Sequence, residues 1–352
     1  MVCVAAFGLF GKQSGQRDGE SGVLAGMRAS YDRWAPPLLR VARSRRGKVA
    51  LTAASALLAI ALTLLAVRHF AVTGWPLSHG NPGLLVAGGL LLLAAYGFKA
   101  YGWERLFAVG ERPRPIALAA ANGGASVTGI ALPGRFDDVV RVAIVRRYPG
   151  CPAGVRSVCL SLFMLGLIDA VALAPLAAVA AAFSGHTVSV RVGLALVAAV
   201  GLGAGAVVLT LPRFLARKRM LRFRLVGWLA PRITCLRSAL QSWALVSACW
   251  VTRALALFLL LGALGIGLSL PRALLFLCAG AAASALPIGP AGAVAQVGAG
   301  AAVLIASGVA TSEAVGFAVA VQAMGALAGG AILLSAVAWR TGLRLVPSRR
   351  LA

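Results

Sequence analysis

The chain has 352 residues, of which 60% are hydrophobic and only 12% are charged. This composition excludes an ordinary soluble domain and is typical of an all-α protein that crosses a membrane several times. Lysine and arginine outnumber aspartate and glutamate by 34 to 9; because they cluster between apolar runs, they indicate attraction to anionic lipid rather than to nucleic acid.

Residues 1–48 contain no apolar run long enough to span a bilayer and no signal-peptide cleavage pattern, so we expect a basic cytoplasmic tail. A transmembrane region over residues 49–338 and a second basic cytoplasmic tail over residues 339–352 follow. The region contains six predicted spans: Val49–Val67, Gly83–Tyr101, Ser157–Phe183, Val192–Leu211, Gln241–Ala263 and Gly316–Ala338. With both tails inside, most basic residues lie on the cytoplasmic side of the cell membrane, as the positive-inside rule requires. Lys99, near the inner end of the second span, is expected to extend its ammonium group toward the interface.

Between the second and third spans lies a weakly apolar run that we expect to re-enter the membrane instead of crossing it. The run breaks at Asn122-Gly123-Gly124 and is followed by Leu132-Pro133-Gly134-Arg135. A full crossing would place the arginines before and after it on opposite sides of the membrane, against the positive-inside rule. We therefore predict a hairpin over about residues 116–133 that enters from the cytoplasm, turns near Gly123-Gly124 and leaves at Pro133 and Gly134. Irregular backbone at this depth implies a polar bundle interior.

A second interrupted segment, over residues 273–307, contains a run that no straight spanning helix would carry, Leu286-Pro287-Ile288-Gly289-Pro290-Ala291-Gly292. We predict a second re-entrant hairpin, entering from the outside, with Pro287, Gly289, Pro290 and Gly292 in its turn. Two such hairpins in halves of opposite orientation make an inverted repeat, which in transporters surrounds the substrate site. Two unrelated proline-broken helices would give the same pattern, so that alternative stays open.

Asp169 and Arg253 are the two charges expected at the middle of spans. Each costs about 2.5 to 3.5 kcal/mol to insert alone, so each is expected to face the bundle and to have a partner. Their depths match, which makes a direct ion pair between them a plausible arrangement. A contact with a passing lipid head group and a purely structural ion pair both remain open.

A second group of charges lies at the mouth of the first hairpin: Arg135, Asp137, Asp138 and Arg141. The planar guanidinium group matches phosphate, so these residues are candidates for holding a lipid head group. Asp137 and Arg141 are also spaced for a contact one helical turn apart. Ordinary ion pairs on an interfacial helix are therefore the alternative interpretation.

Other patterns bear on partners and packing. The sequence contains no nucleotide-binding loop, zinc motif or nucleophile elbow, so we expect no enzyme activity, no cofactor and no metal. The basic segment 212–240 suits the anionic inner leaflet or, alternatively, docking of an envelope glycosyltransferase or lipid synthase. Gly201-x-x-x-Gly205 and Gly325-x-x-x-Gly329 favour close helix crossings. Homo-oligomerisation also stays open.

Several motifs together resemble the lysylphosphatidylglycerol synthase transmembrane, or flippase-like, family over roughly residues 50 to 340: Trp103-Glu104-Arg105-Leu106, Leu132-Pro133-Gly134-Arg135 to Arg147, Leu167-Ile168-Asp169 and Leu286-Pro287 to Gly292. The resemblance implies an integral inner-membrane protein that translocates or binds a phospholipid or other lipid between leaflets, as family members do with aminoacylated lipids, but without the soluble aminoacyl-transferase half. The chain departs from the family pattern at three places. Gly166 stands where an arginine is usual, Gln296 where a glutamate is usual, and Asp137-Asp138 where a Gly-Glu pair is common. Gln296 is thus a further candidate for the head-group site.

Overall fold

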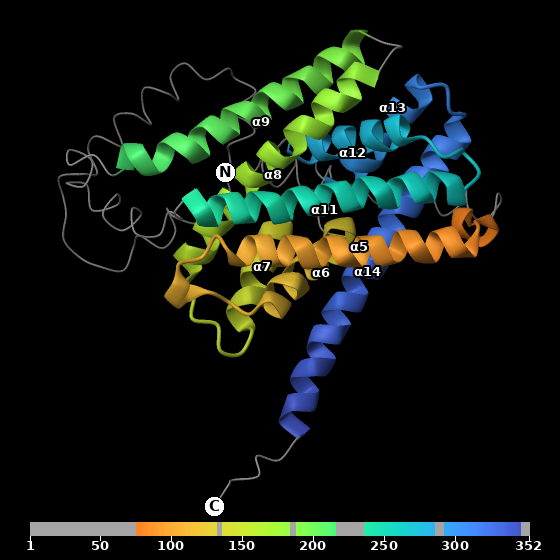
Figure 1. Ribbon diagram of the computed structural model, residues 1–352. Helices are drawn as coiled ribbons and strands as arrows, with labels where there is room; N and C mark the ends of the chain where they lie inside the picture. The colour runs from red at the N-terminus through yellow and green to blue at the C-terminus, as the bar shows by residue number, and fades with distance from the viewer. Residues whose placement is uncertain (1–74, 132–135, 184–187, 216–235, 286–291, 346–352) are drawn as a thin grey trace, which may run out of the picture. The chain divides into compact units, whose positions relative to one another are not determined.

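The computed structural model describes residues 75–131, 136–183, 188–215, 236–285 and 292–345 (Figure 1). All described residues belong to one compact unit, Val67–Ala352. They form helices without any strand, which confirms the all-α prediction for this part of the chain.

Five of the described helices are long and apolar enough to cross a membrane. They are α5 (Pro82–Glu104), α8 (Val155–Phe183), α9 (Val188–Leu215), α11 (Leu236–Ala263) and α14 (Thr311–Leu345). These helices correspond to the second to sixth predicted spans, and they support a multi-pass membrane protein. The predicted first span, Val49–Val67, and the tail over residues 1–48 lie outside the described residues.

The two helices α5 and α11 run side by side in opposite directions (Figure 1). At one end the backbone nitrogen of Asn81 donates to the carbonyl of Ala263, at 2.9 Å. At the other end Gly102 of α5 lies against Val246 of α11. The Asn81 side chain also accepts from the first backbone nitrogens of α5, so α5 begins with a regular N-cap followed by proline.

The segment after α5 forms α6 (Pro115–Ala131), which stays helical through Asn122-Gly123-Gly124. The predicted turn at that place is therefore wrong. Gly123 lies against the backbone of Gly329 in α14, and a methyl group at either glycine would overlap the other helix. This close crossing between helices explains why glycine occurs inside α6 without ending the helix.

The helix α7 (Phe136–Arg147) packs antiparallel to α6. Gly124 of α6 lies against Ile144 of α7, and the two residues are equally far in sequence from residue 134. The two helices α6 and α7 therefore run in opposite directions, and the chain does not turn at Gly123-Gly124. Pro133, Gly134 and Arg135 themselves lie outside the described residues.

A second pair of short antiparallel helices is formed by α12 (Leu270–Ala285) and α13 (Gly292–Ala306). Phe276 packs against Gly300, and Gly280 lies opposite Gln296, so both contacts are centred on residue 288. The two helices flank the predicted interruption. Gly292 is the first residue of α13, while Pro287, Gly289 and Pro290 lie outside the described residues.

The first helix of each pair packs against two spans. Helix α6 packs against α5 and α14, and helix α12 packs against α11 and α8. Trp103, Ile168, Leu260 and Phe317 are fully buried in the resulting core. Gly201 lies against Ala170 and Ala174 where α9 crosses α8, which confirms one close crossing predicted from glycine spacing.

Candidate functional site: a charged cluster between spanning helices

Asp169 lies at the middle of α8, and both oxygens of its carboxylate accept a hydrogen bond. Lys99 of α5 donates to one oxygen at 2.8 Å, and the indole nitrogen of Trp250 in α11 donates to the other at 3.0 Å. The side chains of Lys99 and Asp169 are only 11% and 21% exposed. Asp169 therefore has the partner that its depth requires, but the predicted pair with Arg253 is wrong.

The reach of Lys99 follows from the direction of side chains on a helix. Each Cα–Cβ bond tilts toward the N-terminus of its helix. From near the C-terminal end of α5, the lysine side chain is thus directed back toward the middle of the span, where Asp169 lies. One turn further along α5, the indole nitrogen of buried Trp103 donates to the Ser161 hydroxyl of α8, at 2.9 Å. The expectation that Lys99 extends to the interface is wrong because the bundle supplies a closer carboxylate.

Arg253 of α11 lies between two aromatic rings instead of beside a carboxylate. Its guanidinium carbon is 5.7 Å from the centre of the Tyr96 ring and 5.5 Å from that of Trp250. Among the described residues it has no ion pair and no side-chain hydrogen bond. Cation–π contacts contribute about 0.5 to 2 kcal/mol each, against about 2.5 to 3.5 kcal/mol for inserting a lone arginine. The two rings thus offset much of that cost, and Arg253 remains charged without an acidic partner.

Both rings are themselves held by other helices. Trp250 is fixed by its hydrogen bond to Asp169, and the hydroxyl of buried Tyr96 donates to the main-chain oxygen of Gly325 in α14, at 3.2 Å. Of the predicted close crossing at Gly325-x-x-x-Gly329, the contact of Gly329 with Gly123 confirms one half, while Gly325 has no heavy atom of another helix within 4 Å of the place where a Cβ would lie. The cluster joins α5, α8, α11 and α14. Its two cations and one carboxylate leave one positive charge in excess.

Sequence reasoning found Asp169 and Arg253, placed Lys99 at the interface, and missed Tyr96 and Trp250. A signal for them was present in the sequence. Tyr96-x-x-Lys99 and Trp250-x-x-Arg253 each place an aromatic residue and a cation one turn apart on an apolar helix. Such a pair on a spanning helix indicates a cation that faces protein rather than lipid.

The charges of α7 form local contacts. The Arg141 guanidinium lies 2.7 Å from the Asp138 carboxylate and 3.3 Å from that of Asp137. This confirms the predicted pair of Asp137 with Arg141 and adds Asp138 to it. Both acids lie in the first turn of α7, where the helix dipole favours negative charge. The geometry is that of the local ion-pair alternative, and a head-group role for these residues stays a prediction.

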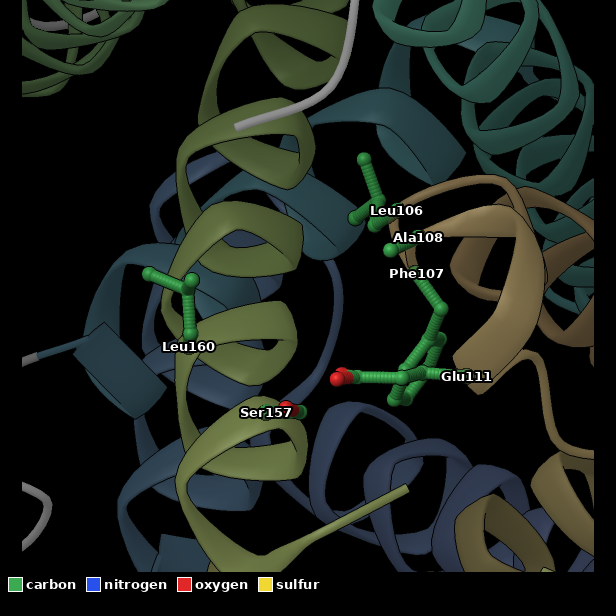
Figure 2. Close-up of a pocket in the computed structure, with 6 residues that line it drawn as sticks. All are labelled: Leu106, Phe107, Ala108, Glu111, Ser157 and Leu160. Atoms are coloured by element: carbon green, nitrogen blue, oxygen red, sulfur yellow. The ribbon is translucent and has the colours of Figure 1, made fainter. Parts of the chain in front are cut away.

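A small hollow lies where the loop between α5 and α6 meets the start of α8 (Figure 2). Leu106, Phe107, Ala108 and Glu111 form one wall, with Ser157 and Leu160 of α8 opposite. Figure 2 shows the Glu111 carboxyl group directed toward Ser157. The hollow offers about 10 Å³ of space, room for roughly one water molecule. It is too small for the head group of a phospholipid.

Two further predicted features are only partly described. Gln296 lies on α13, opposite Gly280 of α12, and its side-chain amide forms no hydrogen bond with another described residue. Of the basic segment 212–240, only the two ends, in α9 and α11, are described, and residues 216–235 lie outside the described residues. The roles predicted for the segment, contact with anionic lipid or docking of an enzyme, therefore stay predictions. Within the described part of the chain, no group of three His, Cys, Asp or Glu residues is suited to a metal ion.

Comparison with known protein families adds one finding. The family described as the lysylphosphatidylglycerol synthase TM region matches residues 47–332 of this chain. The matched range contains the charged cluster and both pairs of short helices, and it extends into the second half of α14. Comparisons with curated proteins and with solved structures gave no match.

Proposed function

Because the chain belongs to the lysylphosphatidylglycerol synthase TM region family, we propose that it is a flippase-like protein of the cell membrane. In this proposal it admits a phospholipid head group into its helical bundle and moves the lipid between leaflets. The observation that carries the proposal is the cluster of Lys99, Asp169 and Arg253 between the spans. Charges at this depth are costly, and they are typical of substrate pathways. The proposal includes no aminoacyl transfer, because the matching family is a membrane region.

An inverted repeat is part of the proposal, and the packing of the helices supports it. The first half is α5, the pair α6 and α7, and α8; the second is α11, the pair α12 and α13, and α14. In each half the first short helix packs on the last span of the other half, α6 on α14 and α12 on α8. The first spans, α5 and α11, pack antiparallel to each other. Exchanging the two halves therefore turns the contact of α6 with α14 into that of α12 with α8, and leaves the contact of α5 with α11 unchanged, as an inverted repeat requires.

We further propose that the two pairs of short helices re-enter the membrane from opposite sides, with both chain termini in the cytoplasm. Asn122 of α6 supports a polar passage beside the first pair. It is only 4% exposed, and neither atom of its amide has a hydrogen-bond partner among the described residues. Buried amides are rarely left unpaired in proteins, and those without a protein partner usually bind water or ligand.

Leaflet exchange in vesicles tests the proposed function. The purified full chain is reconstituted into vesicles that contain phosphatidylglycerol with a fluorescent head-group-proximal label, and an added impermeant quencher reports how fast inner-leaflet lipid reaches the outer leaflet. We expect the wild-type protein to exceed empty vesicles clearly. Asp169→Asn, which removes the charge that Lys99 pairs with, should slow the exchange. Equal rates in wild-type and empty vesicles would contradict the function.

A further inference from the structure

The first spans of the two proposed halves carry the same kind of pair at the same place, an aromatic residue followed three positions later by a cation. Tyr96 and Lys99 lie on α5, and Trp250 and Arg253 lie on α11. Counted back along the sequence from Pro133 and from Pro287, Tyr96 corresponds to Trp250 and Lys99 to Arg253. Each cation follows its aromatic residue by one helical turn, so the repeat extends from helix packing to individual side chains.

The partners of the two aromatic residues correspond as well. Trp250 donates to Asp169 on α8, which begins at Val155, and Tyr96 donates to Gly325 on α14, which begins at Thr311. Asp169 and Gly325 are at the same distance along their helices. Each ring thus hydrogen-bonds to the equivalent position on the last span of the other half.

The correspondence fails at one point, which is the carboxylate. Lys99 has Asp169 beside it, at 2.8 Å. Arg253 has Gly325 at the equivalent position, a residue without a side chain, and no heavy atom lies within 4 Å of the place where its Cβ would be. The second half therefore keeps the cation and the ring but lacks the acid.

The geometry of Arg253 leaves its hydrogen-bond donors available. The two rings of Tyr96 and Trp250 lie beside its guanidinium group. The group's N–H donors lie in its plane, and none of them bonds to another described residue. A planar fork of this kind binds the two oxygens of a phosphate at once, which a lysine ammonium cannot do.

We infer that the place of the missing carboxylate, beside Arg253 and Gly325, is an anion subsite that takes the phosphodiester of an anionic phospholipid. The inference rests on the proposed function, since a lipid reaches this depth only if the bundle admits head groups. The cluster carries one more positive charge than negative, so it is neutralised by a head group with one net negative charge. A zwitterionic head group also carries an ammonium ion, which the excess positive charge of the cluster repels, so it should bind less well.

Binding by the full chain in detergent tests the subsite apart from transport. The probes are short-chain phosphatidylglycerol, phosphatidylcholine of the same chain length, and inorganic phosphate. We expect phosphatidylglycerol to bind more tightly than the other two. Arg253→Gln should weaken its binding about tenfold or more, the effect of losing charge-assisted hydrogen bonds, and Arg253→Lys should fall between. Arg147→Gln, at the exposed end of α7, removes one positive charge elsewhere and serves as the control.

A carboxylate built into the subsite is the sharper variant. Gly325→Asp restores the acid that the repeat lacks, so it should pair with Arg253 and abolish phosphatidylglycerol binding. Gly325→Asn has nearly the same size without the charge and should bind like the wild type. Equal binding of phosphatidylglycerol and phosphatidylcholine, tightest binding of inorganic phosphate, or undiminished binding by a folded Gly325→Asp or Arg253→Gln protein would overturn the inference.

The two proposals fail separately. Leaflet exchange whose rate depends neither on head-group charge nor on Arg253 would contradict the subsite and leave the proposed function standing. Phosphatidylglycerol binding that depends on Arg253, without any leaflet exchange, would remove the function and leave the subsite. If Gly325→Asp does not fold, phosphatidylglycerol binding by Arg253→Lys and Arg253→Gln tests the subsite instead.

Discussion

The ammonium group of Lys99 lies 2.8 Å from the carboxylate of Asp169 and joins α5 to α8 inside the bundle. Because Lys99 satisfies Asp169, the second cation at this depth, Arg253, has no acidic partner among the described residues. It lies between the rings of Tyr96 and Trp250 instead. This division between one paired and one unpaired cation is the feature on which the functional account rests.

A double-mutant cycle on Lys99 and Asp169 tests the pair. Asp169→Asn leaves a part-buried lysine without its counter-ion, and Lys99→Met leaves a part-buried carboxylate; removing one partner of a buried pair costs about 3 kcal/mol or more. The double variant leaves neither charge and should be less destabilised than the sum of the two. Thermal unfolding of the purified variants in detergent measures this. Additive losses would mean that the two side chains do not interact.

The crossing of α6 and α14 gives a second prediction. A methyl group at Gly123 would overlap the backbone of Gly329, so Gly123→Ala should cost about 1 to 3 kcal/mol of stability, as overpacking does. Gly129→Ala is the matched control on the same helix, since no atom lies within 4 Å of its Cβ position. That change should be neutral or stabilise by up to about 1 kcal/mol, because alanine favours helix. Similar unfolding temperatures for both variants would rule out the close crossing.

The sides from which the two hairpins enter can be tested by labelling. Single cysteines at Arg114, just before α6, and at Leu268, just before α12, in a chain whose own cysteines are replaced by alanine, should react with an impermeant maleimide from opposite faces. The proposed inverted repeat places the start of the first pair on the cytoplasmic side and the start of the second pair on the outer side. Inside-out and right-side-out vesicles provide the two exposures, and a marker protein of known orientation fixes their sidedness. Labelling of both positions from one face would contradict the inversion.

Much of the fold follows from local sequence, because spans are long apolar runs. Five predicted spans agree with α5, α8, α9, α11 and α14 within a few residues. The interruption around Pro287 also falls between α12 and α13, since two prolines so close together, Pro287 and Pro290, disfavour a continuous helix. The contact of Asp137 with Arg141 was predictable as well, because both residues lie on one helix.

The errors all concern contacts between helices. Asn122-Gly123-Gly124 looks like a turn in isolation, yet those glycines allow α14 to approach α6. Asp169 and Arg253 have matching depths, but depth does not say which helices are neighbours around the axis of the bundle. Lys99 reaches Asp169 because α5 and α8 face each other there. Only the assembled bundle contains that information.

The most direct measurement compares phosphatidylglycerol exchange between leaflets in vesicles that carry Arg253→Gln or Arg147→Gln at equal protein density. Both variants remove one arginine, but only Arg253 belongs to the charged cluster. The account predicts wild-type exchange for Arg147→Gln and a loss of about tenfold or more for Arg253→Gln, the effect of removing charge-assisted hydrogen bonds to phosphate. Equal exchange by the two folded variants would contradict it.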